Sequence, residues 1–249
     1  MANYENQPRF GAGVARGAEG AIDAGLRAHM IRVYNYMTIG LVLTGVTAWA
    51  VVNTSLVNLF FQVQDTGQVG LTVLGWIALI APLGLVFAIS FGIQRMSVGT
   101  AQILFWGYAA LMGISLSPIL LVYTGASVAR TFFITAATFG SMSLWGYTTS
   151  RDLTGMGRFL MMGVIGLVIA MVVNIFLQSS AMDFAISVIG VLAFTGLTAY
   201  DTQKIKEMYY AGDDGTVAGR KAIMGALSLY LDFVNLFLFL LRLFGNNRN

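Results

Sequence analysis

Seven long apolar stretches, separated by short polar turns, dominate the chain. Each has about the ~20 residues that a helix needs to cross ~30 Å of hydrocarbon, and the first five contain no charged residue. A membrane-spanning β-barrel would instead show alternating segments of about ten residues. The pattern therefore predicts an all-α membrane protein, a bundle of seven transmembrane helices over Tyr36–Val52, Val69–Phe91, Thr100–Tyr123, Thr131–Thr149, Phe159–Leu177, Phe184–Tyr200 and Ala222–Leu241.

The same pattern divides the chain into three parts. Residues 1–32 are polar, rich in Gly and Ala, and basic, and no apolar core with a cleavage site follows at signal-peptide spacing. We predict that they form a flexible cytoplasmic tail. Residues 33–245 are the predicted seven-helix transmembrane domain, and residues 246–249 are a short C-terminal tail.

Composition agrees with a lipid-covered protein. The chain is 57% hydrophobic and only 10% charged, whereas soluble domains carry about 25% charged residues. The absence of cysteine excludes disulfides, thiolate metal sites and thiol catalysis. No Lys/Arg cluster is interleaved with aromatic residues, so we expect no nucleic-acid partner. We also expect no cofactor, and the lipid bilayer is the first partner that the composition implies.

Positive charge is distributed unevenly along the chain. With a cytoplasmic N-terminus, eleven of the 14 Lys and Arg residues fall on the cytoplasmic side, and Arg130, Arg242 and Arg248 fall on the other. Cytoplasmic loops carry the excess of positive charge in membrane proteins, so this distribution predicts an N-in orientation. The C-terminus lies outside if the seventh stretch crosses fully; a re-entrant last helix is the alternative.

Two acidic residues interrupt the apolar stretches near the C-terminal end. Asp232 lies about 15 Å along the seventh stretch, and Asp201 ends the sixth. An ionised side chain at a helix centre costs about 2.5–3.5 kcal/mol on insertion scales, so each of these acids is a candidate functional residue.

Each acid belongs to a polar stripe. Ser228, Asp232 and Asn235 share one helical face by their spacing, and Asp201 borders a face with Thr198. Consecutive antiparallel helices would let the stripes meet, and two carboxyls in a dry site share a proton because both cannot ionise cheaply. That arrangement is a candidate proton-gated latch.

Simpler interpretations remain open for both acids. Asp201 is alternatively an interfacial residue paired with Lys204 or Lys206. Asp232 is alternatively a protonated packing residue, hydrogen-bonded between helices.

Three segments resemble the bacterial branch of the Bax inhibitor-1 family: AYDTQKIK (Ala199–Lys206), LSLYLDFVNLFLFLLRLFG (Leu227–Gly245) and GISLSPILLVY (Gly113–Tyr123). The resemblance covers everything after the tail. It implies six helices around a central seventh, a location in the bacterial inner membrane, and an aspartate pair, matching Asp201 and Asp232, that senses pH and controls a calcium leak.

One departure from the family pattern concerns the second helix. Calcium-leak members of the family carry an acid and an arginine there, whereas the second stretch here has neither and contains Pro82. Arg95, slightly further along the chain, is the candidate substitute for that arginine.

These observations favour a pH-sensitive calcium (cation) leak, with calcium ions and protons as partners. Ca²⁺ takes about six to eight oxygen ligands, and Asp201, Asp232, Ser228 and Asn235 supply fewer, so any calcium binding is expected to be transient, as conduction requires. The alternative is a regulatory protein that binds a membrane protease or another membrane partner through its tail. We expect no enzymatic activity, because the second motif of the aspartyl intramembrane proteases, GxGD, is absent.

Overall fold

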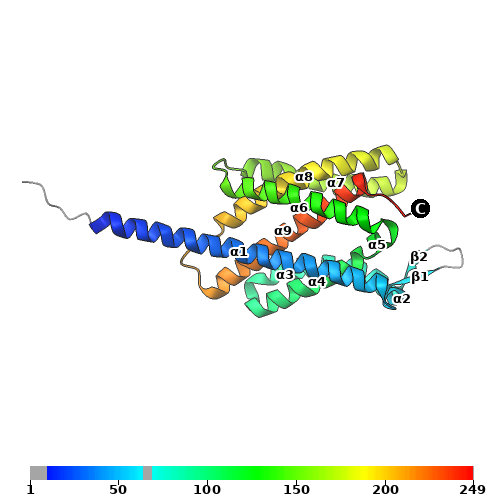
Figure 1. Cartoon of the computed structure of the whole chain (residues 1–249), viewed down its shortest axis with the longest axis horizontal. Helices are drawn as coiled ribbons and strands as arrows, with labels where there is room; N and C mark the ends of the chain where they lie inside the picture. The colour runs from blue at the N-terminus through cyan, green and yellow to red at the C-terminus, as the bar shows by residue number, and fades with distance from the viewer. Residues whose placement is uncertain (1–9, 64–68, 249) are drawn as a thin grey trace, which may run out of the picture.

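The computed structural model describes residues 10–63 and 69–248 and places most of them in helices (Figure 1). A two-stranded antiparallel hairpin, β1 (Phe61–Val63) and β2 (Val69–Leu71), is the exception. The helices in chain order are α1 (Phe10–Asn53), α2 (Val57–Phe60), α3 (Val73–Gly92), the 3₁₀ turn η1 (Ile93–Arg95), α4 (Val98–Leu116), α5 (Pro118–Val122), α6 (Gly125–Thr148), α7 (Thr154–Leu177), α8 (Ser180–Glu207) and α9 (Gly215–Phe244).

Six helical segments of the described chain are long and apolar enough to cross a membrane. They are Ala24–Asn53, Val73–Arg95, Val98–Val122, Thr154–Leu177, Ser180–Glu207 and Gly215–Phe244. Helix α6, which contains most of the fourth predicted stretch, has 24 residues but is rich in Thr, Ser and Gly and carries Arg130 in its second turn. The chain is thus a multi-pass helical membrane protein, and the seventh crossing stays a prediction.

The first helix begins earlier than the sequence predicted. Residues 10–32, assigned to a tail, are helical and continue without a break into the first span, while residues 1–9 lie outside the described chain. His29 and Met30 are buried, so this part of the predicted tail packs against the bundle. No proline interrupts residues 10–32, and alanine, the strongest helix former, is their commonest residue, so helix can continue despite the glycines.

Local sequence explains most of the helix boundaries. Small polar side chains accept hydrogen bonds from free backbone N–H groups in the first turns, with the N-caps Thr72, Ser97, Thr124, Ser179 and Asp214. Pro118 starts α5 directly after α4, since proline lacks the N–H that a continuing helix would need. The third predicted span is therefore two helical pieces.

Two groups of helices lie on either side of α9 (Figure 1). Helices α1, α3 and α4 pack together on one side, and α6, α7 and α8 pack together on the other. Helix α9 contacts members of both groups, namely α1, α4, α6 and α8.

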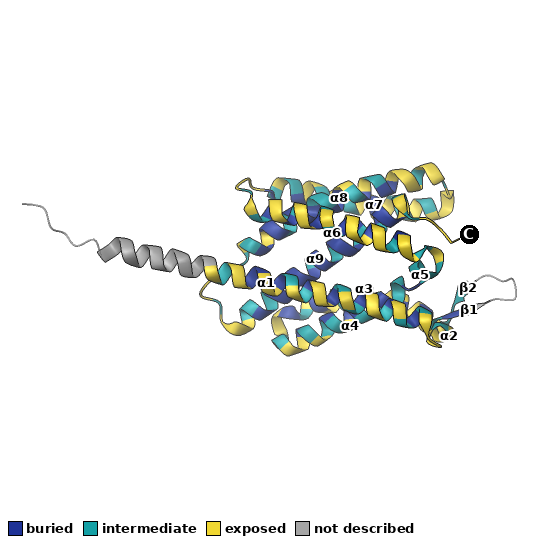
Figure 2. Ribbon diagram, viewed as in Figure 1, coloured by how far each residue is buried: buried dark blue, intermediate teal, exposed yellow. Residues whose placement is uncertain are grey.

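Burial follows this arrangement (Figure 2). In α9, 67% of the residues in the apolar stretch are buried, against 6% in α7. The outward faces instead expose large apolar side chains, such as Phe91, Phe176 and Val73, as expected of surfaces that face lipid rather than water.

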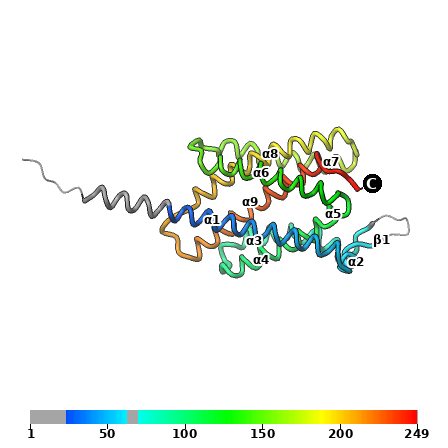
Figure 3. The backbone as a smooth tube through the Cα atoms, in the orientation of Figure 1, coloured from blue at the N-terminus to red at the C-terminus, as the bar shows by residue number. Residues whose placement is uncertain are grey.

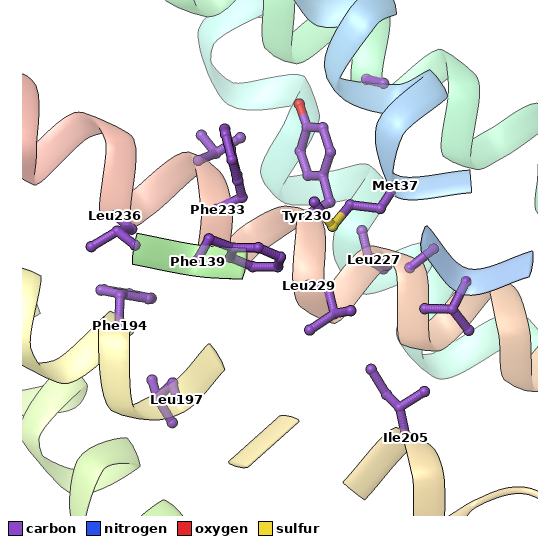
Figure 4. Close-up of a cluster of buried hydrophobic side chains, with 14 of the residues drawn as sticks. Met37, Phe139, Phe194, Leu197, Ile205, Leu227, Leu229, Tyr230, Phe233 and Leu236 are labelled. Carbon is purple, nitrogen blue, oxygen red and sulfur yellow. The ribbon is translucent and has the colours of Figure 1, made fainter. Parts of the chain in front are cut away.

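The core consists of apolar side chains that converge on α9 (Figure 4). Phe233 packs edge-on against Phe132 and Phe139 of α6, with ring centroids 5.5 Å apart in both pairs. On the α8 side, the Phe239 ring stacks on Phe194 at 5.8 Å. Aromatic contacts of this kind fix the rotation of α9 about its own axis.

The segment after α9 returns to the start of α6 (Figure 3). Thr124 N–H donates to Asn246 O at 3.0 Å, Asn246 N–H donates to Ser127 Oγ at 2.9 Å, and Arg248 N–H donates to Val122 O at 2.8 Å. This end of α9 therefore lies beside the α5–α6 junction, at the end of the bundle opposite the α8–α9 loop.

Candidate functional site: a carboxyl pair between α8 and α9

Asp232 lies in the most buried helix of the described chain. Its side chain is 4% exposed, and it is flanked on the same face by the half-buried Ser228 and Asn235. Asn235 donates its Nδ2–H to Leu231 O at 2.8 Å, one turn back on the same helix. The Asn235 amide is thus hydrogen-bonded within its own helix. Of the three residues of this stripe, Asp232 is the most deeply buried.

On α8, the polar stripe that Asp201 borders contains Thr198 and Thr202. Thr198 and Thr202 are fully buried, and their hydroxyls donate to Phe194 O at 2.8 Å and Thr198 O at 2.7 Å. Asp201 itself is half-buried. Threonine hydroxyls that bond to carbonyls one turn back satisfy their own polarity, which leaves the carboxyl as the group of this stripe that requires another partner.

Helix register brings the two carboxyls together. Helices α8 and α9 run antiparallel, with Gly190 against the Phe239 ring and Gly225 against Ile205. In this register Asp201 lies within about one helical turn of the position opposite Asp232, so the two carboxyls lie near each other on facing helices.

The pair is incompletely satisfied. Asp232 Oδ2 is buried and has no hydrogen-bond partner in the described chain. A buried carboxyl oxygen without a partner is costly, and two carboxyls at this range can share one proton. The site can therefore change its charge by taking up or releasing a proton.

Close helix packing holds Asp201 in place. At Gly146 of α6 a Cβ atom would overlap the carbonyl oxygen of Ala199, and at Gly157 of α7 it would overlap the Tyr200 ring. Both contacts lie within two residues of Asp201. Small residues at such positions allow helix backbones to approach closely in membranes, so α6 and α7 fix α8 on two sides.

Lysines near the pair are directed elsewhere. Lys206 donates from Nζ to Tyr147 O at 2.9 Å, and Lys204 is an exposed charge that acts on Asp201 from the next turn of α8. Neither lysine forms an ion pair with Asp201 in the described chain, where the ion pairs are Lys221–Asp213 and Arg242–Asp183. The interfacial ion pair weighed for Asp201 is therefore not formed in this structure.

Arg95, the candidate substitute for the family arginine, is exposed at the end of η1. The ion pairs among the side chains that the structure describes do not include it. The structure thus does not bring Arg95 to the carboxyl pair, because η1 turns the chain toward α4 at the surface of the bundle.

A hydroxyl chain that sequence reasoning missed leads to the α8 stripe. Tyr34 OH lies 2.5 Å from Ser143 Oγ, which lies 2.9 Å from Thr202 Oγ1. Thr202 uses its one proton on Thr198 O, so Ser143 donates to Thr202 and Tyr34 donates to Ser143. The chain links α1, α6 and α8 next to Asp201. No local signal marks it, since the first two residues are 109 positions apart.

A second buried polar contact lies on the other side of α9. Tyr230 OH is 2.6 Å from Thr44 Oγ1, and the Thr44 hydroxyl lies 2.9 Å from both Gly40 O and Ala109 O. Tyr230 is thus the donor to Thr44, and Thr44 donates to the carbonyls. Every polar atom of this contact has a partner.

The carboxyl pair offers few metal ligands. In the described part of the chain, no group of three or more His, Asp or Glu side chains gathers to hold a metal ion. Two carboxyls fall short of the six or more oxygens of a stable calcium site. This geometry is compatible with brief occupancy by a cation and with proton exchange, not with storage of a metal.

Comparison with known proteins gives one family and several bacterial relatives. A family model described as "Inhibitor of apoptosis-promoting Bax1" matches residues 26–249. The inner membrane protein YbhL of Escherichia coli K12 is 49% identical over 227 residues, 90% of this chain and 94% of its own length. Uncharacterized proteins of Rickettsia prowazekii and Caulobacter vibrioides are 52% and 48% identical, covering 91% and 96% of this chain and 93% and 98% of their own lengths.

Proposed function

This chain belongs to the Bax inhibitor-1 family, and we propose that it is a pH-sensitive cation leak pathway whose gate is the Asp201–Asp232 pair. The observation that carries the proposal is the buried Asp232 carboxyl, which keeps one oxygen without a partner in the described chain and lies on the helix that packs against the one carrying Asp201. A bundle that needed only stability would have little use for this pair, because apolar residues of similar volume are often at least as stabilising.

The gate follows from the charge of the pair. With one shared proton, the two carboxyls attract each other and hold α8 against α9. Loss of that proton places two like charges at short range in a site of low dielectric, and gain of a second proton removes the charge that would attract a cation. Each change alters the contact between the two helices, so proton concentration controls the pathway.

Calcium is the proposed cargo because carboxylate oxygens suit a hard divalent cation. The two carboxyls give too few ligands to retain the ion, and weak occupancy permits it to leave. The proposal is non-enzymatic, and it requires no role for Arg95.

The proposed setting is the bacterial inner membrane, with seven spans and a cytoplasmic N-terminus. Helix α6 would be the fourth span and would bring the total to seven, with α9 at the centre of the bundle. The inner-membrane relative, the position of α9 between two helix groups and the excess of Lys and Arg at the predicted cytoplasmic end support this arrangement.

The test is calcium flux into dye-loaded proteoliposomes between about pH 5 and pH 8, the range in which physiological proton switches act. We expect a pH-dependent leak for the wild type and a flat pH profile for Asp232→Asn and Asp201→Asn, since the amide keeps the shape of the side chain and cannot titrate. Asp183→Asn is the matched control, because Asp183 is an exposed carboxylate paired with Arg242 at the far end of α8. A wild type that passes no calcium at any pH would reject the leak.

A further inference from the structure

An apolar groove runs between α1 and α6 on the side of the bundle that faces lipid. Its volume is about 1050 Å³, and Phe139 and Phe233 form part of its floor. Its walls come from α1, with Arg27, Tyr34, Val42 and Gly45, and from α6, with Gly140 and Tyr147.

The protein leaves this space open by using small residues on its rim. A Cβ atom at Gly45 or Gly140 would meet nothing within 4 Å, so the two helices do not close on each other there. An apolar space that opens into the hydrocarbon of a membrane is filled by lipid, because water gains no hydrogen bonds in it. Its size is at the upper end of ligand pockets, which span about 300–1,000 Å³.

One end of the groove is polar and positively charged. Arg27 is the charged side chain of the described lining, and Tyr34 and Tyr147 lie at the same end. Lys206 lies beside this end, outside the lining itself: its Nζ donates to Tyr147 O at 2.9 Å and is 5.3 Å from the centroid of the Tyr147 ring. The described lining contains no acidic residue. An apolar channel that ends in an arginine and a lysine matches an acyl chain that ends in a phosphate.

We propose that this groove binds one anionic phospholipid, with an acyl chain along α1 and α6 and the phosphate at Arg27 and Lys206. Long cationic side chains at a helix end reach the headgroup layer while their stems stay along apolar surface. The site is independent of the aspartate pair, so it stands whether or not the protein conducts calcium.

The test uses the absence of cysteine from the chain. Val42→Cys places a fluorophore on the rim of the groove, and Val168→Cys places the same fluorophore on the lipid-facing surface of α7. Both proteins are reconstituted in vesicles that contain brominated phosphatidylglycerol or, at the same mole fraction, brominated phosphatidylcholine. We expect stronger quenching by the anionic lipid at residue 42 and equal quenching by the two lipids at residue 168.

Two pairs of variants separate the headgroup from the acyl chain. Arg27→Gln should reduce the preference for the anionic lipid about fivefold, while Arg32→Gln, an exposed α1 arginine outside the groove lining, should leave it unchanged. Gly140→Phe fills the groove and should abolish the excess quenching. Gly166→Phe adds the same side chain in open space on α7 and should not.

Equal quenching by the two lipids at residue 42 would overturn the proposal. The same conclusion would follow if Arg27→Gln and Arg32→Gln behaved alike. If residue 42 were shielded from both lipids and the Val42→Cys protein formed disulfide-linked dimers, the occupant would be a second copy of the chain and the lipid site would be rejected.

Discussion

Tyr230 and Asp232 are two residues apart on α9, and both are buried, yet their polar atoms meet different surroundings. Tyr230 faces α1 and α4, where its hydroxyl donates a hydrogen bond to Thr44 Oγ1 and the Thr44 hydroxyl in turn donates to the carbonyls of Gly40 and Ala109. Asp232 lies on the part of α9 that packs against α8, the helix of Asp201, and its Oδ2 has no hydrogen-bond partner in the described chain. The same helix thus carries a fully hydrogen-bonded polar group on one face and an incompletely hydrogen-bonded one on the other.

The difference teaches how to distinguish structural from functional polarity inside a membrane protein. A fully satisfied contact contributes stability and specifies how helices pack. A contact that leaves a buried oxygen without a partner gives up part of that stability, and such sites are retained where a change of protonation or of conformation is useful. Under the proposed function, Tyr230 belongs to the architecture and Asp232 to the gate.

The largest loss of stability is expected from a substitution that displaces α8, the helix that carries Asp201. Gly146→Ala places a methyl group where the Ala199 carbonyl oxygen already lies, so α6 and α8 must separate. Because backbone cannot move aside as a flexible side chain can, we expect a loss of about 3 kcal/mol of stability, measured by unfolding in mixed detergent micelles.

Gly140→Ala on the same helix is the matched control, since its added methyl group meets open space. It should leave the unfolding transition in place or raise it slightly, because alanine favours helix over glycine. Equal stability of the two variants would mean that α6 and α8 do not approach as closely as described.

A direct comparison of the two faces uses Tyr230→Phe and Asp232→Asn. Tyr230→Phe removes the donor to Thr44 and should lower the free energy of unfolding by about 1 kcal/mol, with the pH profile of the leak unchanged. Asp232→Asn should lower the free energy of unfolding by less, because its amide can donate to Asp201 as the proposed shared proton does. The same variant should flatten the pH profile of the proposed leak. The assignment fails if Tyr230→Phe, rather than Asp232→Asn, alters the response to pH.

The smallest expected effect concerns the hydroxyl chain beside Asp201. Ser143→Ala interrupts the link between Tyr34 and Thr202 but leaves Thr202 bonded to Thr198 O. We expect a loss of about 0.6 kcal/mol, the average for hydrogen bonds between membrane helices, in the same unfolding measurement. Ser141→Ala, an exposed serine on α6 that bonds only within its own helix in the described structure, should have no measurable effect.

Much of the fold could be predicted because membranes impose length and apolarity on each helix. The sequence also isolated Asp201 and Asp232, since an acid in an apolar stretch stands out without any knowledge of contacts. The early start of α1 at Phe10 was missed, because a polar Ala-rich segment looks like a tail until its buried residues, such as Met30, are placed against a partner.

Long-range partners could not be predicted. Tyr34, Ser143 and Thr44 are ordinary residues in apolar helices, and their roles depend on which helices adjoin and at what rotation. The groove between α1 and α6 has no sequence signal either, because it arises from two helices that do not close on each other. Arg95 was predicted to substitute for the family arginine because it follows the second span in sequence, but the structure does not place it at the aspartates.

The position of α9 has a consequence for how the protein is made. The eight α-helices that precede it leave the ribosome first, and six of them form the two groups that meet chiefly through a helix not yet synthesised. Until α9 arrives, both groups must wait in the bilayer with their future inner faces covered by lipid. The bundle is then completed late, when α9 inserts and displaces lipid from these faces. The groove between α1 and α6 is the place where α9 does not displace the lipid.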